Sequence, residues 1–191
     1  PLKMADVALP TYEPEQVFIK VLTIGLNFAD TLLMSGKYQE KPRLPFAPGM
    51  EVCGFIEKCG EKVLNFKRGQ RIVAYVGFGG LAEFISVNQN LCFPVPDSIP
   101  DEKAASLMIA YGSTELALNY RAKLQKGETL LVLGASGGVG LSAVQIGKAM
   151  GAIVVAVARG ETKCLLARSM KKVDQDTTFS KSKQIPSAVR A

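Results

Sequence analysis

Residues 129–140 read TLLVLGASGGVG, a short apolar run that leads directly into a cluster of glycines. The run has the length and unbroken hydrophobicity of a strand in a parallel sheet that is covered on both faces. Residues 139–151 (VGLSAVQIGKAMG) favour a helix that ends at a glycine, and residues 152–158 (AIVVAVA) favour a second buried strand. A strand, a helix and a strand within about 30 residues are typical of the βαβ unit of α/β domains. This stretch therefore predicts an α/β fold with a Rossmann-type sheet.

The small residues of this loop approximate the GxGxxG fingerprint of dinucleotide-binding domains. Ala135, Gly137 and Gly140 occupy its three glycine positions. Alanine is tolerable at the first position if its φ is negative. Gly137 would let the backbone approach a pyrophosphate, and Gly140 would let the helix pack closely on the strand. The free N–H groups of the helix N-terminus would then face the phosphates; the alternative is a tight turn without a ligand.

The end of the second strand indicates which dinucleotide the loop would bind. NAD-binding domains place an acidic residue about 20 residues further on, where it accepts the ribose 2′-hydroxyl. This chain has Arg159 in that region, followed by Glu161 and Lys163. Arg159 and Lys163 could neutralise a 2′-phosphate, so the sequence favours NADPH over NADH. The alternative is that both are solvated cations at a loop.

The first half of the chain favours β-structure, because short β-branched runs alternate with turns that contain Gly and Pro. This pattern indicates a compact barrel-like domain. A short helix is predicted at residues 27–36. The predicted strands are residues 17–23, 51–59, 70–78 and 80–88.

The second half changes to helical spacing. Helices are predicted to begin within residues 97–110 and to cover residues 110–124 and 161–170. From residue 171 the chain is polar and lacks periodicity, which predicts disorder. The predicted organisation is a first domain at residues 1–106, the first βαβα of a Rossmann domain at residues 107–170, and a disordered tail at residues 171–191.

Composition argues against several function classes. The formal net charge of +6 is not gathered into a basic stripe with interleaved aromatics, so nucleic-acid binding is not favoured. No apolar run approaches the roughly 20 residues of a membrane span. Four cysteines without a CxxC pair, and no histidine, predict reduced thiols and no metal site. A cytoplasmic location is expected, or a mitochondrial one if a targeting segment precedes residue 1.

The chain resembles the medium-chain dehydrogenase/reductase superfamily, and within it the zinc-free quinone oxidoreductase group. The resemblance spans residues 1–170, and three segments carry it. These are GLNFADTLLMSGKYQEKPRLPFAPGMEVCGFIEKCGEKVLNFKRGQRIVA at residues 25–74, AYGSTELAL at residues 110–118 and GETLLVLGASGGVGLSAVQIGKAMGA at residues 127–152. It implies a GroES-like β-barrel domain beside a Rossmann domain that holds NADPH.

The resemblance also implies roles for individual residues. Zinc-dependent relatives carry a Cys near position 27 and a His near position 50; this chain has Asn27 and Met50, so no catalytic zinc is expected. Asn27 and Tyr38 match the residues that line the nicotinamide end of the site, and they are the expected catalytic residues. Tyr38 has the alternative role of a packed aromatic, and Asp30 is either a helix cap or a site carboxylate.

Ser113 falls where the family carries a Thr near the cofactor phosphates, and Lys163 falls where NADPH-using relatives often contact the 2′-phosphate. The expected cofactor-binding residues are Ser113, Ala135, Ser136, Gly137, Gly138, Val139, Gly140, Arg159 and Lys163.

The implied reaction is hydride transfer from NADPH to a quinone or an activated enone, with Tyr38 and Asn27 as hydrogen-bond donors to the oxygen that gains charge. After Met170 the sequence departs from the family, whose sheet continues through further strands. The truncated sheet would lack the edge strand through which relatives dimerise, and it could make the chain inactive. The alternative function is a non-catalytic truncated isoform that acts as a binding or regulatory partner.

Overall fold

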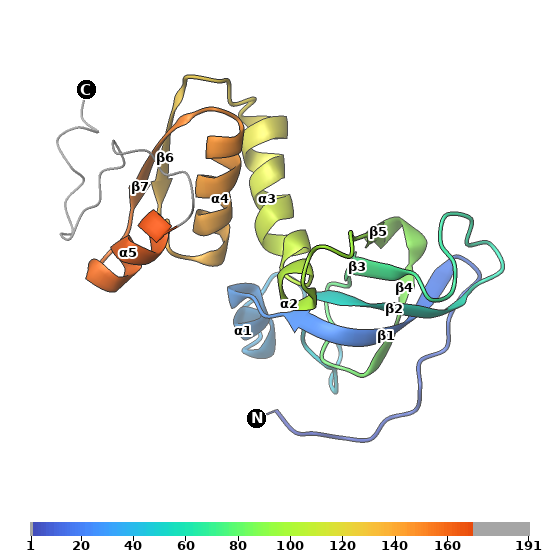
Figure 1. Ribbon diagram of the computed structural model, residues 1–191. Coiled ribbons are helices and arrows are strands. Elements are labelled where there is room, and N and C mark those ends of the chain that lie inside the picture. Colours follow the sequence, from blue (N-terminus) through green and yellow to red (C-terminus); the bar gives the residue numbers. More distant parts are fainter. Residues whose placement is uncertain (1, 170–191) are drawn as a thin grey trace. The chain divides into compact units, whose positions relative to one another are not determined.

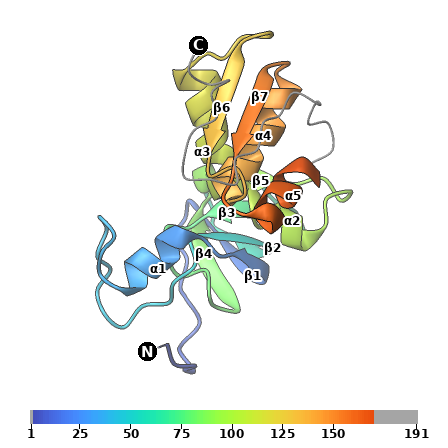
Figure 2. The same cartoon turned by 90° about the vertical axis from the view of Figure 1, so that its left-hand side faces the viewer.

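The computed structural model describes residues 2–169, so the tail predicted to be disordered lies outside the described residues. The chain divides between Ile109 and Ala110 into two compact units (Figures 1 and 2). The domain limits expected from the sequence place the boundary slightly earlier, at residue 106, and stay a prediction. No described helix has both the length and the hydrophobicity needed to cross a bilayer.

The first unit is built on an antiparallel sheet with the strand order β4-β1-β2-β3-β5 (Figure 1). The four strands expected from the sequence are confirmed. The three-residue strand β5 is too short to give a recognisable alternating pattern. The elements are β1 (Gln16–Gly25), α1 (Phe28–Met34), β2 (Glu51–Cys59), β3 (Arg71–Tyr75), β4 (Phe84–Asn88), the 3₁₀ turn η1 (Gln89–Leu91), β5 (Cys92–Pro94) and α2 (Asp101–Ala104).

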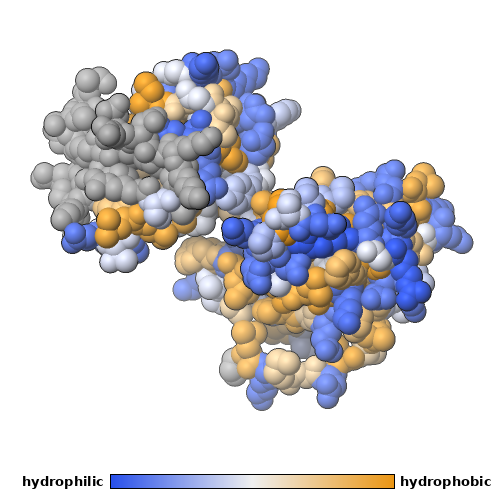
Figure 3. Space-filling view, viewed as in Figure 1, coloured by the Kyte–Doolittle hydropathy of each residue, from blue (hydrophilic) through white to orange (hydrophobic). Residues whose placement is uncertain are grey.

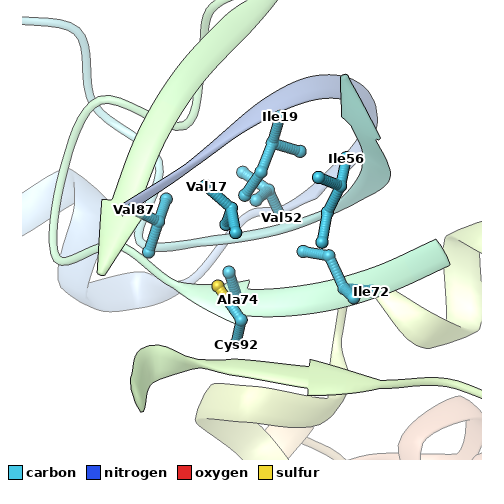
Figure 4. Close-up of a cluster of buried hydrophobic side chains, with 8 residues drawn as sticks. All are labelled: Val17, Ile19, Val52, Ile56, Ile72, Ala74, Val87 and Cys92. Carbon is cyan, nitrogen blue, oxygen red and sulfur yellow. The ribbon is translucent and has the colours of Figure 1, made fainter. Parts of the chain in front are cut away.

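Alternate side chains of β2 and β3 point to opposite sides of the sheet, and each side packs against other residues. On one face, Cys53 and Val73 pack against Val95 and the alanines of α2 and its end, Ala104 and Ala105. The other face holds the main hydrophobic core, shown in Figure 4 and formed by Val17, Ile19, Val52, Ile56, Ile72, Ala74, Val87 and Cys92.

The second unit contains the predicted βαβα arrangement. Strands β6 and β7 pair in parallel, with Leu133 opposite Val157, and α4 connects them. Gly151, at φ +80°, follows the end of α4, as expected of a glycine that terminates a helix. The elements are α3 (Gly112–Glu115), β6 (Thr129–Leu133), α4 (Gly138–Ala149), β7 (Ile153–Val157) and α5 (Glu161–Ser169).

Within the described chain only one face of this sheet is covered. Val132, Val154 and Ala156 pack with Val144 of α4. Leu133 points to the other side of the pleat and is 63% exposed. Figure 3 shows apolar residues at the surface of both units.

The helix expected at residues 110–124 is interrupted by π-helical turns, η2 (Leu107–Tyr111) and η3 (Leu116–Arg121), on either side of α3. The hydroxyl oxygens of Thr114 and Ser142 lie 2.6 Å apart, and each is 2.9 Å from the Ala110 carbonyl oxygen. A carbonyl that accepts from side-chain hydroxyls is drawn out of the regular helical ladder. Ser142 lies 28 residues from Thr114 and 32 residues from Ala110, so the periodicity of the sequence could not indicate these hydrogen bonds or the π-helical turns beside them.

Candidate functional site: a glycine loop and a buried amide–carboxylate pair

The glycine loop of the second unit forms a tight turn between β6 and α4. Gly134 adopts a φ of +73°, a conformation that favours glycine. The N–H groups of Gly134 and Ala135 both donate to the carbonyl of Val157, at 3.0 Å, which fixes the loop to the end of β7. Ala135 is fully buried and does not have a positive φ, so alanine is compatible with the first fingerprint position.

Glycine is required by packing at Gly140 but not at Gly137 or Gly138. A Cβ at Gly140 would lie 2.3 Å from the Gly134 carbonyl oxygen, so only glycine allows α4 to approach the loop this closely. At Gly137 the nearest atom to an added Cβ would be 3.5 Å away, and at Gly138 it would be 4.0 Å away. Gly137 also has a φ of −82°, which any residue can adopt. An added Cβ at either position would make only ordinary van der Waals contacts, so the fold itself does not require glycine at residues 137 and 138.

The N-terminus of α4 has the character of an anion-binding site. The first N–H groups of any α-helix lack intrahelical acceptors, and here no side chain caps them. The helix dipole adds a partial positive charge at this end. The uncapped amides fit a diphosphate, and a Cβ at Gly137 or Gly138, where the fold does not require glycine, would crowd it.

The remaining candidates of the second unit lie at the same end of its sheet or beside the loop. Because β6 and β7 are parallel, the glycine loop and Arg159 follow adjacent strand ends. Arg159 and Lys163 are exposed, and Lys163 lies in the first turn of α5. Ser113 is exposed on α3, next to Thr114, whose hydroxyl lies 3.3 Å from the Val139 carbonyl oxygen of the loop.

In the first unit, Asn27 is the N-cap of α1 and lies between two buried carboxylates. Its side-chain Nδ2 donates to Oε1 of Glu51 at 2.7 Å, and its backbone N–H donates to Oδ2 of Asp30 at 2.8 Å. The other Asp30 oxygen accepts from the Gly49 N–H at 2.9 Å. Asp30 therefore caps α1 and braces the loop that leads into β2, as the structural alternative expects.

Glu51 opens β2 and is 1% exposed. Its Oε2 accepts from the Ile109 N–H at 2.9 Å. Burial raises the pKa of the Glu51 carboxyl, while hydrogen bonds from Asn27 and from the Ile109 and Met108 backbone lower it, and burial prevails.

Tyr38 is half-buried in the loop after α1, where its backbone N–H donates to the Leu32 carbonyl at 3.2 Å. Within the described chain its hydroxyl has no hydrogen-bond partner, so it is available to a ligand. It lies close enough to Tyr75 that, after burial and Glu40, it helps to raise the pKa of the Tyr75 phenol. Among the described residues, no hydrogen bond joins Tyr38 and Asn27.

Met50 is buried, and no group of three Cys, Asp or Glu side chains is placed to bind a metal among residues 2–169. The sequence did not single out Glu51 or Gly134 as site residues. A signal for Glu51 exists, since it is a carboxylate at the start of an otherwise apolar strand; Gly134 could have been recognised by its place at the strand end.

Comparisons with known proteins agree with this architecture. The model of the alcohol dehydrogenase GroES-like domain matches residues 13–97. The chain is 38% identical over 168 residues to quinone oxidoreductase-like protein 2 of Rattus norvegicus, a match that covers 87% of this chain and 48% of the relative. It is 41% identical over 158 residues to quinone oxidoreductase of Mus musculus, a match that covers 82% of this chain and 48% of the relative.

A solved structure shows the same likeness. The quinone oxidoreductase of Thermus thermophilus, also determined as a complex with NADPH, matches with a TM-score of 0.79 and 37% identity, over 88% of this chain and 53% of that one. The chain therefore spans about half the length of the curated and solved relatives that it matches.

Proposed function

We propose that this chain, which belongs to the medium-chain dehydrogenase/reductase superfamily and is homologous to quinone oxidoreductases, binds NADPH and takes part in hydride transfer to a quinone or an activated enone. The observation that carries the proposal is the presence of two glycines, Gly137 and Gly138, at the N-terminus of α4, where the fold does not require them. Neither the φ of Gly137 nor the packing around the two residues requires glycine, whereas a diphosphate against the backbone would require it.

The preference for NADPH rests on Arg159 and Lys163. Both are exposed cations that follow β7, at the sheet end that carries the glycine loop. A 2′-phosphate would gain charge-assisted hydrogen bonds from them, which a 2′-hydroxyl would gain only weakly. The complex of the Thermus thermophilus relative with NADPH supports the same choice.

The substrate side of the proposal rests on Tyr38 and Asn27. When bound, the dinucleotide would supply the hydride. The oxygen of the substrate carbonyl then gains negative charge, and hydrogen-bond donors held in place stabilise it. The Tyr38 hydroxyl is such a donor, and Asn27 retains one amide hydrogen beyond the one given to Glu51.

A pair of glycine variants tests cofactor binding. The chain with Gly137→Ala should fold normally, since its Cβ has room, but should bind NADPH at least about tenfold more weakly, a loss of about 1.4 kcal/mol. Gly127→Ala, at a positive φ away from the loop, is the control for general strain. Isothermal titration with NADPH measures both, and unchanged affinity in the Gly137→Ala chain would contradict the proposal.

A charge reversal tests the choice of dinucleotide. Arg159→Glu should weaken NADPH binding and leave NADH binding nearly unchanged. Lys126→Glu, which precedes β6 and so lies at the opposite sheet end, should change neither. Turnover is tested with 9,10-phenanthrenequinone and NADPH. A chain that gives neither turnover nor a thermal shift with NADPH would exclude the proposed enzyme and favour a non-catalytic role.

A further inference from the structure

A buried charge that the proposed function leaves unused lies beside Asn27. Glu51 is almost inaccessible, and among the described residues no Lys or Arg forms an ion pair with it. Its oxygens are met by N–H donors instead: Asn27 Nδ2 on Oε1 and the Ile109 backbone on Oε2. A buried carboxylate supported only by N–H donors is costly to keep, so each donor is held to it firmly.

The geometry fixes the Glu51 side chain as well as its partners. A Cβ at Gly25 would lie 2.4 Å from Oε1 and 2.5 Å from the Ala105 carbonyl oxygen, so the carboxylate occupies space that exists only because residue 25 is glycine. Ile109 is the last residue of the first unit. Glu51 thus connects the Asn27 side chain to the backbone at that boundary.

The consequence concerns the two ends of the Asn27 amide. When Glu51 is ionised, its carboxylate only accepts hydrogen bonds, so it selects the amide nitrogen of Asn27, as in the contact from Nδ2 to Oε1, and excludes the amide oxygen. The backbone of Asn27 is held independently by Asp30, at 2.8 Å. The side-chain oxygen of Asn27 also faces the backbone N–H of Asp30, which completes a capping box. With its backbone fixed and one amide hydrogen committed to Glu51, Asn27 presents its second amide hydrogen in one defined direction.

We propose that Glu51 is a positioning residue, which sets the orientation of the Asn27 amide. Its effect on turnover rests on the proposed function, in which Asn27 contacts the substrate; the orientation itself does not.

The orientation is tested without any assay of activity, by the side-chain amide resonances of Asn27 in the ¹⁵N-labelled full chain. They are assigned by their loss in Asn27→Ser. In Glu51→Gln the glutamine oxygen still accepts from the backbone and its amide nitrogen faces Asn27, so the Asn27 amide must turn round. The hydrogen-bonded amide proton of Asn27 should then move upfield. Ser142→Ala, which removes a buried hydroxyl in the second unit, is the control for a general loss of stability and should leave the resonance pair in place.

A folded Glu51→Gln chain with unchanged Asn27 resonances would overturn the proposal. Should that variant not fold, the unmodified chain decides the matter by side-chain hydrogen exchange. One Asn27 amide proton should be protected and the other should exchange freely, whereas fast exchange of both would overturn the proposal.

Kinetics then test the consequence. In Glu51→Gln the kcat with 9,10-phenanthrenequinone should fall about tenfold with KM for NADPH nearly unchanged, as expected when an interaction of the transition state is lost. Absence of turnover in the unmodified chain would refute the proposed function but not the positioning, which the resonances decide separately.

Discussion

Cys92 lies on β5 with 5% of its surface exposed, and burial raises the pKa of its thiol to about 12. Since the thiolate is the reactive form, the folded chain should protect Cys92 from iodoacetamide at pH 8. Cys59, which is only partly buried, should be modified first. Mass spectrometry of peptides from native and urea-unfolded chains measures the difference, and equal modification of Cys92 in both would contradict the burial described.

Glu51 makes a prediction about pH. Its folded pKa is raised above the ordinary value of 4.5, so the fold favours the protonated carboxyl. Between those two pKa values the folded chain keeps a proton that the unfolded chain has lost. The stabilisation is therefore complete below the ordinary pKa and is lost as pH rises through the folded pKa.

Compared with Glu51→Gln, which has no such proton, the unmodified chain should lose unfolding free energy as pH rises from about 4 towards neutrality. Urea unfolding of both chains across this range measures the difference. A difference that grows with pH would mean that the hydrogen bonds, and not burial, determine the pKa of Glu51.

At the scale of elements, the close packing of α4 against the loop that follows β6 requires glycine at residue 140. A Cβ at Gly140 would meet backbone atoms, which cannot move aside as a flexible side chain can. Gly140→Ala should therefore destabilise the chain by about 1–3 kcal/mol, whereas Gly137→Ala should cost less than half of this. Thermal unfolding of the two variants compares them, and equal losses would show that the loop geometry is not as described.

Elements with a strong period were predictable from sequence, and elements fixed by tertiary contacts were not. The alternating run in β1 and the apolar runs of β6 and β7 indicated their strands closely. Strand β5 and the π-helical turn η2 gave no such signal. One is too short for a pattern, and the other accompanies hydroxyl contacts between Thr114 and Ser142, which are 28 residues apart.

At the scale of the whole molecule, the same distinction separates the two parts of the candidate site. The glycine loop between β6 and α4 is local in sequence, so its glycine spacing indicated the turn. The structure adds that packing requires glycine at residue 140 and does not require it at residue 137. The pair formed by Asn27 and Glu51 joins residues 24 positions apart through the fold of the first unit, and only Asn27 was expected. Tyr38 stays a prediction, with a hydroxyl that the described chain does not use.

The most direct test of the central claim is a titration of the ¹⁵N-labelled full chain with NADPH, followed by its backbone amide resonances. Binding at the N-terminus of α4 predicts the largest shifts at Gly137, Gly138, Val139 and Gly140, because their N–H groups would meet the diphosphate. Arg159 should shift with NADPH and much less with NADH. Saturable binding that leaves these loop amides unshifted, or no binding at all, would contradict the account.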